Sequence, residues 1–397
     1  MKFNNTIKST RDSNVLISYF SALLLLCTIP PSFAWNNIIP GLAAVMFAVL
    51  IIGDIVAKGL NKHIWLPCCF LVLYAIYAFL SSFNFNGFLF ILSIPLLFFA
   101  KDSIHLDTYK AFKNIFALLL VVSILMYILV VFLNAPISGN EIKPLNEGKT
   151  DVFIHYPFLV TVVRFGVVVP RFQCIFDEPG VVGTMCAIIL AAEKYNLKDK
   201  INYVFLISGI LSLSLFFFLI CGVYVLLNAK MKYKIIVAIL VMAFYVVFAD
   251  NDILNDLVFQ RFIFDDGEAF GDNRSAQGFD SFYEGFRKSP DYLWGLGAGK
   301  GELLNEGGSS YKQVIVDFGL IFFLFYMVIF LFLCKFMKMR TKDAIFMLFV
   351  ISGVMYQRPF VGLLHWSFLL YVSCVYTYTM FPRVNRAKQN IILQKVS

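Results

Sequence analysis

Apolar runs rich in Phe, Leu, Ile and Val recur along this chain and are separated by shorter polar stretches. Many of these runs come close to the roughly 20 residues that a helix needs to cross the hydrocarbon of a bilayer. They lack the sustained alternation of apolar and polar residues that is typical of a transmembrane β-barrel. The pattern predicts an all-α polytopic membrane protein with about 12 transmembrane helices, in which residues 1–397 form a single integral membrane domain. The predicted helices are 15–34, 38–57, 64–82, 85–100, 114–133, 179–192, 201–213, 214–228, 235–249, 309–333, 343–357 and 361–381.

Two longer polar stretches interrupt this pattern. The larger, residues 250–308, mixes Asp, Glu, Arg, Gly and aromatic residues. Loops of this length are uncommon unless they are functional or disordered. The other stretch, residues 134–178, contains an apolar part from Phe158 to Val169, some of which we expect to lie along the membrane or dip into it. We predict that both stretches lie on the outer side of the membrane.

Composition and charge support a membrane protein and suggest its orientation. Hydrophobic residues make up 60% of the chain and charged residues 15%, and the net charge is +8. Lys and Arg near the ends of spans favour the cytoplasmic side. Two short helices hinged near Ser212 and Ser214 would keep the lysines at 230, 232 and 234 on that side, whereas one helix over 201–228 would not. We favour the hinge, and both termini are then cytoplasmic.

The eight cysteines do not suggest a disulfide framework. All except Cys174 fall in or beside apolar runs, and the chain has only four histidines. Neither a Cys-x-x-Cys pair nor a Cys/His cluster occurs. The sequence therefore predicts no metal site.

Two arginines stand in semi-apolar surroundings. Arg164 and Arg171 belong to the stretch VVRFGVVVPRFQ. An ionisable group at membrane depth usually faces a partner or an aqueous cavity, and the planar guanidinium suits bidentate contacts with phosphate. Each arginine could instead pair with an outer acid or reach the lipid headgroups. For the pair we favour anion binding.

The sequence Phe176-Asp177-Glu178-Pro179-Gly180 precedes an apolar run. Acidic residues followed by Pro are typical of a helix start. Glu178 could in addition position an arginine or accept a proton from a sugar hydroxyl, as carboxylates do in glycosyl chemistry. Both roles remain open for this residue.

The large loop carries an aromatic stripe. Phe279, Phe282, Tyr283 and Phe286 recur at helical intervals, so we predict an amphipathic helix over 275–288. Ser289-Pro290 ends it, and closely spaced glycines from Gly295 onward predict a tight, irregular turn. The stripe favours packing over sugar stacking, although both are open.

Several motifs follow one another in a fixed order along the chain. The outer segment leads into the FDEPG motif, and a pair of short serine-hinged helices follows. Arg274 then precedes the aromatic helix, the motif SPxxLWGxGxG and a Gly-Leu-Ile-Phe stretch that begins at Gly319. This order resembles that of the bacterial O-antigen polymerase and O-antigen ligase superfamily. Arg274 and Gly285 fit the family's Arg-x10-Gly spacing, whereas Arg171 meets Gly180 and Gly183 instead.

The resemblance implies a glycosyltransferase that joins oligosaccharide repeat units on undecaprenyl diphosphate into polysaccharide. It would act at the periplasmic face of the bacterial inner membrane without a cofactor, with membrane lipid around it and a separate chain-length regulator as a partner. It implies no role with nucleic acid. A ligase remains the alternative, although the family's loop histidine is missing between 250 and 310. A lipid-linked oligosaccharide flippase, which is not an enzyme, is the rival from another class.

The same resemblance implies a set of site residues. Those expected to be catalytic are Arg171, Arg274 and Glu178. Those expected to bind substrate are Arg164, Arg287, Asp177, Gly180, Tyr283 and Trp294.

Overall fold

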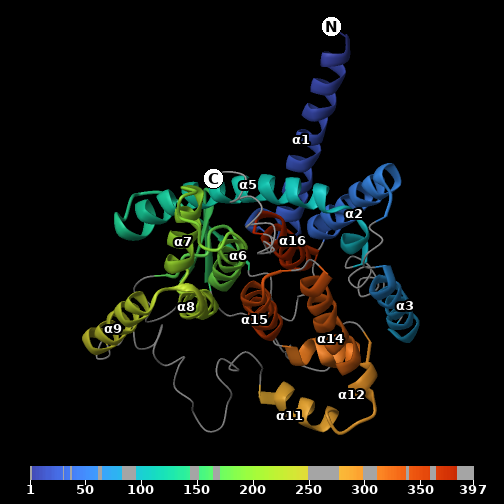
Figure 1. Cartoon of the computed structure of the whole chain (residues 1–397). Coiled ribbons are helices and arrows are strands. Elements are labelled where there is room, and N and C mark those ends of the chain that lie inside the picture. The colour runs from blue at the N-terminus through green and yellow to red at the C-terminus, as the bar shows by residue number, and fades with distance from the viewer. Residues whose placement is uncertain are drawn as a thin grey trace, which may run out of the picture.

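A computed structural model of the chain describes residues 2–29, 31–35, 38–60, 65–82, 95–143, 152–163, 170–248, 277–297, 311–336, 339–357 and 364–381. Its helices are α1 (Lys2–Thr28), α2 (Ile38–Lys58), α3 (Trp65–Ser82), α5 (Asp102–Tyr127), α6 (Pro179–Ala192), α7 (Ile201–Leu211), α8 (Leu215–Asn228), α9 (Met231–Phe248), α11 (Gln277–Phe286), α12 (Asp291–Trp294), α14 (Tyr311–Phe336), α15 (Thr341–Gln357) and α16 (Leu364–Met380). A 3-10 turn covers Ser32–Ala34, and a π-helical turn, Ile128–Phe132, extends α5. Figure 1 shows how these elements are arranged.

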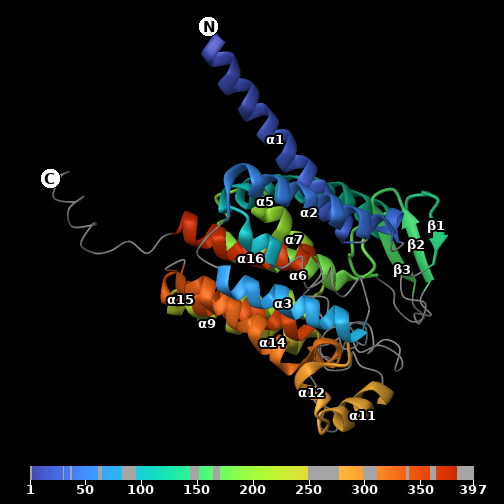
Figure 2. The ribbon, with the colours of Figure 1, turned by 90° about the vertical axis from the view of Figure 1, so that its right-hand side faces the viewer.

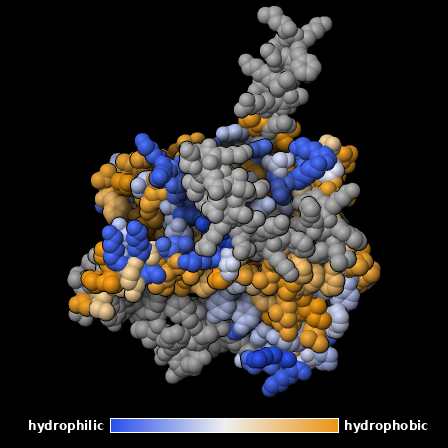
Figure 3. Space-filling model, in the orientation of Figure 1, coloured by the Kyte–Doolittle hydropathy of each residue, from blue (hydrophilic) through white to orange (hydrophobic). Residues whose placement is uncertain are grey.

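The predicted helical membrane character is confirmed. Three described stretches, Ile38–Lys58, Asp102–Phe132 and Tyr311–Leu333, are long and apolar enough to cross a membrane, and several shorter helices are equally apolar. Most of the predicted helix 85–100 lies outside the described residues; the other predicted helices coincide with observed ones. Many large apolar side chains on the helices are exposed, as expected for contact with lipid, and Figure 3 shows them on the flanks of one face.

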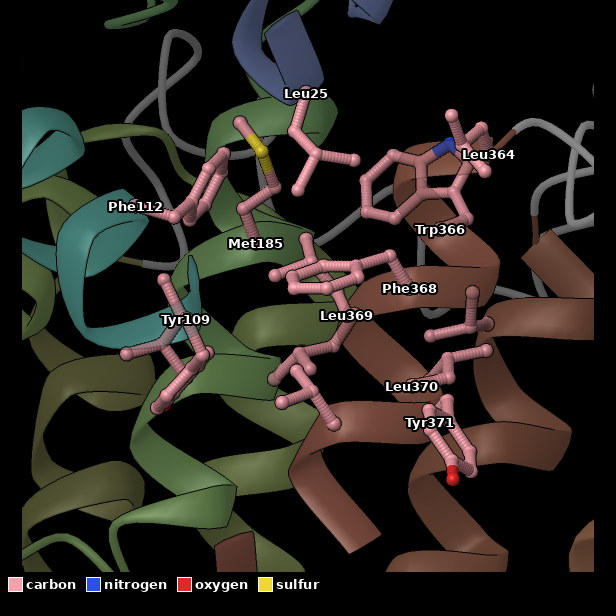
Figure 4. Close-up of a cluster of buried hydrophobic side chains, with 14 of the residues drawn as sticks. Leu25, Tyr109, Phe112, Met185, Leu364, Trp366, Phe368, Leu369, Leu370 and Tyr371 are labelled. Carbon is pink, nitrogen blue, oxygen red and sulfur yellow. The ribbon is translucent and has the colours of Figure 1, made fainter. Parts of the chain in front are cut away.

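The core is built around α6 and α16. Nearly every residue of these two helices is buried, so neither has the polar face of a surface helix. Their apolar side chains meet those of α1 and α5, as Figure 4 shows for Leu25, Phe112, Met185 and Phe368. The segments that hold the candidate site are therefore fixed to the most buried part of the described fold.

A small antiparallel sheet interrupts the helical pattern in the first outer segment. It consists of β1 (Asn140–Ile142), β2 (Val152–Tyr156) and β3 (Leu159–Val163), in that order. Figure 2 shows it beside the C-terminal part of α5, where Ser123 Oγ donates to the carbonyl oxygen of Phe158 in the β2–β3 turn. The sequence pattern did not predict these short strands.

The predicted break near Ser212 and Ser214 is present. α7 ends at Leu211, Leu213 has a left-handed φ of 47°, and α8 begins at Leu215. The hydroxyl of Tyr224 on α8 donates to the carbonyl oxygen of Lys194, just beyond the end of α6. α8 therefore returns toward the segment from which α7 starts, and the two helices form a hairpin around α6.

The hairpin is too short to cross a membrane. α7 has 11 residues, which gives a length of about 16 Å. A bilayer core is about 30 Å thick. The residues at the tip of the hairpin, Ser212–Ser214, therefore lie at membrane depth if α7 starts near one surface.

A second break divides α14 at Gly319. This residue has φ 85° and ψ 160°, which no helix contains. Gly295, with φ 83°, lies against it so closely that a Cβ on either glycine would collide with the other segment's backbone. The amides of Leu296 and Gly297 donate to the carbonyl oxygens of Val316 and Asp317. The backbone of residues 293–297 thus packs directly on the backbone of α14 at Gly319, where the apolar part of α14 begins.

Candidate functional site

Arg171 binds the tip of the α7–α8 hairpin. Its Nε donates to the carbonyl oxygen of Ser212 at 3.0 Å, and Nη2 donates to that of Leu213 at 2.8 Å. The amide of Phe172 donates to the carbonyl oxygen of Leu211. A helix end leaves carbonyls without partners inside the helix, and a bilayer core offers no water to satisfy them. The guanidinium therefore stabilises a hinge that lipid alone would not tolerate.

The segment that carries Arg171 is also fixed to α5. The hydroxyl of Tyr127 donates to the carbonyl oxygen of Pro170 at 2.6 Å, and the rings of Tyr127 and Phe172 pack edge to face. Tyr127 lies 14 residues beyond Lys113 on α5, a rise of about 21 Å. Because Tyr127 belongs to the stretch Asp102–Phe132, which is long and apolar enough to cross a membrane, Arg171 lies alongside a candidate membrane span.

The FDEPG motif begins α6, as predicted. Glu178 is the N-cap in an extended conformation, Pro179 is the first helical residue, and the carbonyl oxygen of Gly180 accepts a hydrogen bond from Thr184 Oγ1. Asp177, Glu178 and Gly180 are all half-buried. Acidic groups at a helix N-terminus interact favourably with its dipole. The helix-start role of the motif is thereby confirmed, while its part in chemistry stays a prediction.

Gly183 brings α6 against the hinge. A Cβ at this position would collide with the side chains of Ser212 and Ser214. The N-terminus of α8 therefore packs against α6 about one turn beyond the first residue of α6. Two helix N-termini, which carry partial positive charge, and the Arg171 guanidinium thus share one region with the Asp177 and Glu178 carboxylates.

The other predicted site residues of the described chain lie on α11 and α12. The ring of Tyr283 is only 4% exposed and packs with Phe279, Phe286, Ile315 and Val316, as the packing interpretation of the stripe requires. Arg287 is exposed at the end of α11. The side chain of Trp294 is 51% exposed and its ring lies 6.1 Å from that of Tyr77, edge to face.

The structure does not bring these residues into contact with Arg171. α11 and α12 pack on α14, whereas Arg171, Asp177, Glu178 and Gly180 belong to one continuous segment beside the hairpin. Arg164 and Arg274 lie outside the described residues. Whether the large loop completes the site with Arg274 therefore stays a prediction.

A buried ionic cluster, which sequence reasoning missed, lies at the opposite end of α6. Lys113 Nζ on α5 lies 2.9 Å from Glu193 Oε1 and 2.7 Å from Asp199 Oδ2. Lys113 and Glu193 are almost fully buried. The pKa of the Asp199 carboxyl is lowered, because the hydrogen bond and charge of Lys113 outweigh the opposing effect of burial.

The neighbouring lysine extends this cluster to α15. Lys194 Nζ lies 2.8 Å from Asp343 Oδ2, which also accepts from Arg340 Nε at 2.7 Å. Burial lowers the pKa of the Lys194 ammonium, although Asp343 acts in the other direction. A signal was present in the sequence, since Glu193 and Lys194 immediately follow an apolar helix, but their partners are far away in the chain. We interpret this cluster as structural, because its ion pairs connect α5, the segment after α6 and α15.

Comparison with known proteins gives no match. No protein-family model fits the chain, and neither a curated protein nor a solved structure is significantly similar to it. Within the described residues, no group of three His, Cys, Asp or Glu side chains could hold a metal ion. The groups that the described residues place at the hinge are a guanidinium, helix N-termini and carboxylates, which can bind an anion and move a proton.

Proposed function

We propose that this chain is an O-antigen polymerase, a glycosyltransferase that joins undecaprenyl-diphosphate-linked repeat units at the periplasmic face of a bacterial inner membrane. One observation carries the proposal. Arg171 is held by the hinge carbonyls of Ser212 and Leu213, beside the N-termini of α6 and α8. A lipid diphosphate presents its charge close to the membrane surface, where such a group could meet it.

The proposed mechanism is displacement of a lipid diphosphate. The bond between the anomeric carbon of the donor glycan and the diphosphate oxygen breaks, and its electron pair stays on the leaving group. A hydroxyl of the acceptor repeat unit forms the new bond to that carbon and loses its proton. Arg171 would stabilise the charge that develops on the leaving group, more strongly in the transition state than in the ground state. Glu178 is the proposed acceptor of the proton.

The proposed topology places this reaction outside the cytoplasm. Both chain termini would lie in the cytoplasm, α7 and α8 would enter the membrane and return as a hairpin, and the segments 134–178 and 250–308 would face the periplasm. Arg274, Arg287, Tyr283 and Trp294 would then hold the saccharide of the second substrate, with Arg164 near the diphosphate. The binding partners would be the lipid-linked oligosaccharide and a chain-length regulator.

Arg171→Ala tests the proposal. We expect a strain that carries this variant to lose the long chains of its lipopolysaccharide ladder and to retain core plus one repeat unit, since removal of one preorganised donor lowers kcat by about 10²–10³. Lys288→Ala is the matched control, because Lys288 is an exposed cation of the outer elements and is not part of the proposed site. Its ladder should be normal.

The phenotype of the deletion strain separates the alternatives. Core plus one repeat unit indicates a polymerase, whereas a bare core indicates a ligase or a flippase. Normal ladders from an Arg171→Ala protein that is stably inserted in the membrane would contradict the assignment of this residue.

A further inference from the structure

A buried amide without a partner lies within the candidate site. The side chain of Gln173 is 1% exposed, and neither its Nε2 nor its Oε1 has a hydrogen-bond partner among the described residues. The backbone around Gln173 is held in place, since Phe172 and Cys174 are fully buried and the carbonyl oxygen of Gln173 accepts a hydrogen bond from the amide of Phe176. The backbone therefore fixes this side chain inside the protein.

Such an arrangement is costly unless something binds the amide. A buried polar group without a hydrogen bond costs about 1–3 kcal/mol, and a carboxamide has both a donor and an acceptor to satisfy. An apolar residue of similar shape would avoid this cost. Buried polar groups without partners are rare in native proteins, and each needs an explanation.

The position of Gln173 indicates what the amide binds. It lies two residues from Arg171 and four from Asp177, in the segment that runs from Arg171, which binds the hinge, to the start of α6. Arg171, Asp177 and Glu178 are half-buried, so both ends of this segment reach the molecular surface. A group that binds beside these residues is therefore a candidate partner for Nε2 and Oε1. The partner must both donate and accept hydrogen bonds, as a hydroxyl does.

We propose that Gln173 is a substrate-binding residue whose carboxamide binds a hydroxyl group of the lipid-linked saccharide. This inference rests on the proposed function, and it adds a residue that the charged motifs do not include. The guanidinium of Arg171 holds the anionic end of the substrate, and Gln173 holds a sugar hydroxyl next to it. An internal water molecule is the other source of a hydroxyl, and the experiment separates the two.

Gln173→Met is the test variant, because Met is unbranched and of similar size but lacks both amide groups. We expect its melting temperature in detergent to equal or exceed that of the wild type, since an unsatisfied amide has been removed. With purified undecaprenyl-diphosphate-linked repeat units as substrate, we expect KM to rise about tenfold, the loss of one hydrogen bond, and kcat to stay within about twofold. Ser21→Ala is the control. Ser21 Oγ is likewise buried without a partner among the described residues, but it lies on α1.

The outcomes are distinct. If the wild-type protein forms no polymer, the proposed function fails, whatever Gln173 does. If the wild type is active and Gln173→Met has an unchanged KM, the amide binds only water or nothing, and the inference is overturned. A clear fall in the melting temperature of Gln173→Met also overturns it, because the amide then has a partner within the protein itself.

Discussion

At the scale of single residues, two cations near opposite ends of α6 have different hydrogen-bond partners. Lys113 meets the Glu193 and Asp199 carboxylates at one end of α6, so its own charge is compensated within the protein. Arg171 at the other end meets backbone carbonyls, which carry only partial charge. We therefore interpret Lys113 as structural, whereas the part of Arg171 in binding an anion stays a proposal.

The sequence pointed to Arg171 more clearly than to Lys113. Arg171 stands out in the sequence because it lies in an apolar stretch. A hinge near Ser212 and Ser214 was also predicted, but the hydrogen bonds between Arg171 and the hinge were not. The partners Lys113 and Asp199 lie 86 residues apart, and each reads as an ordinary charge near a helix end. Gln173 was overlooked since an amide carries no charge. Only the packed structure shows that its amide atoms have no hydrogen-bond partner among the described residues.

Removal of the Lys113 ammonium should destabilise the protein strongly. Lys113→Ala leaves the Glu193 carboxylate buried without its cation, which typically costs about 3–5 kcal/mol. We expect a large fall in the melting temperature of the purified protein. Lys110→Ala is the control on the same helix. Its pair with Asp107 is exposed, with side chains 56% and 58% exposed, and such pairs contribute only about 0–1 kcal/mol. Equal effects of the two substitutions on the melting temperature would contradict a structural role of this cluster.

At the scale of elements, periodicity predicted the helices and missed the irregular backbone. Long apolar runs identify α2, α5 and α14 without difficulty. The break at Gly319 could not be predicted, because an isolated glycine in an apolar run is compatible with a continuous helix. The strands β2 and β3 have only five residues each, and their mixed pattern looked like a membrane-surface segment. In both places the chain's path depends on distant contacts.

Gly319→Ala should disrupt the junction between α12 and α14. The φ and ψ of Gly319 are accessible essentially only to glycine, which alone costs about 1–3 kcal/mol. An added Cβ would also collide with the backbone of Leu293, Trp294 and Gly295. We expect a much lower melting temperature and less protein in the membrane. Gly222→Ala is the control, since a Cβ there meets nothing within 4 Å. That substitution should be neutral or stabilise α8 by up to about 1 kcal/mol. A Gly319→Ala protein as stable as the control would contradict the junction.

At the scale of the whole molecule, the proposed position of the large loop depends on the hairpin of α7 and α8. α7 and α8 flank α6 and bring the segments around Lys198 and Lys230 to the same level of the fold. The aromatic pair of Tyr195 and Tyr224, with ring centroids 4.4 Å apart, joins the two ends. The sequence predicts a membrane-spanning helix over 235–249, most of which belongs to α9. If this prediction holds, the loop after α9 lies opposite the lysines, on the side proposed for the chemistry.

Alkaline phosphatase, which is active only outside the cytoplasm, tests this arrangement when inserted within the full chain. We expect insertions after Lys198 and after Lys230 to be silent, because the hairpin returns both segments to the cytoplasmic side, and an insertion after Asp256 to be active. Activity at Lys230 together with silence at Lys198 would mean that residues 201–228 cross the membrane as one helix, and the hinge that Arg171 holds would not exist there. Silence at Asp256 would leave the hinge intact but put the large loop in the cytoplasm. Arg274 could then not share a periplasmic site with Arg171, and catalysis by the pair would be excluded even if Arg171 alone proved essential.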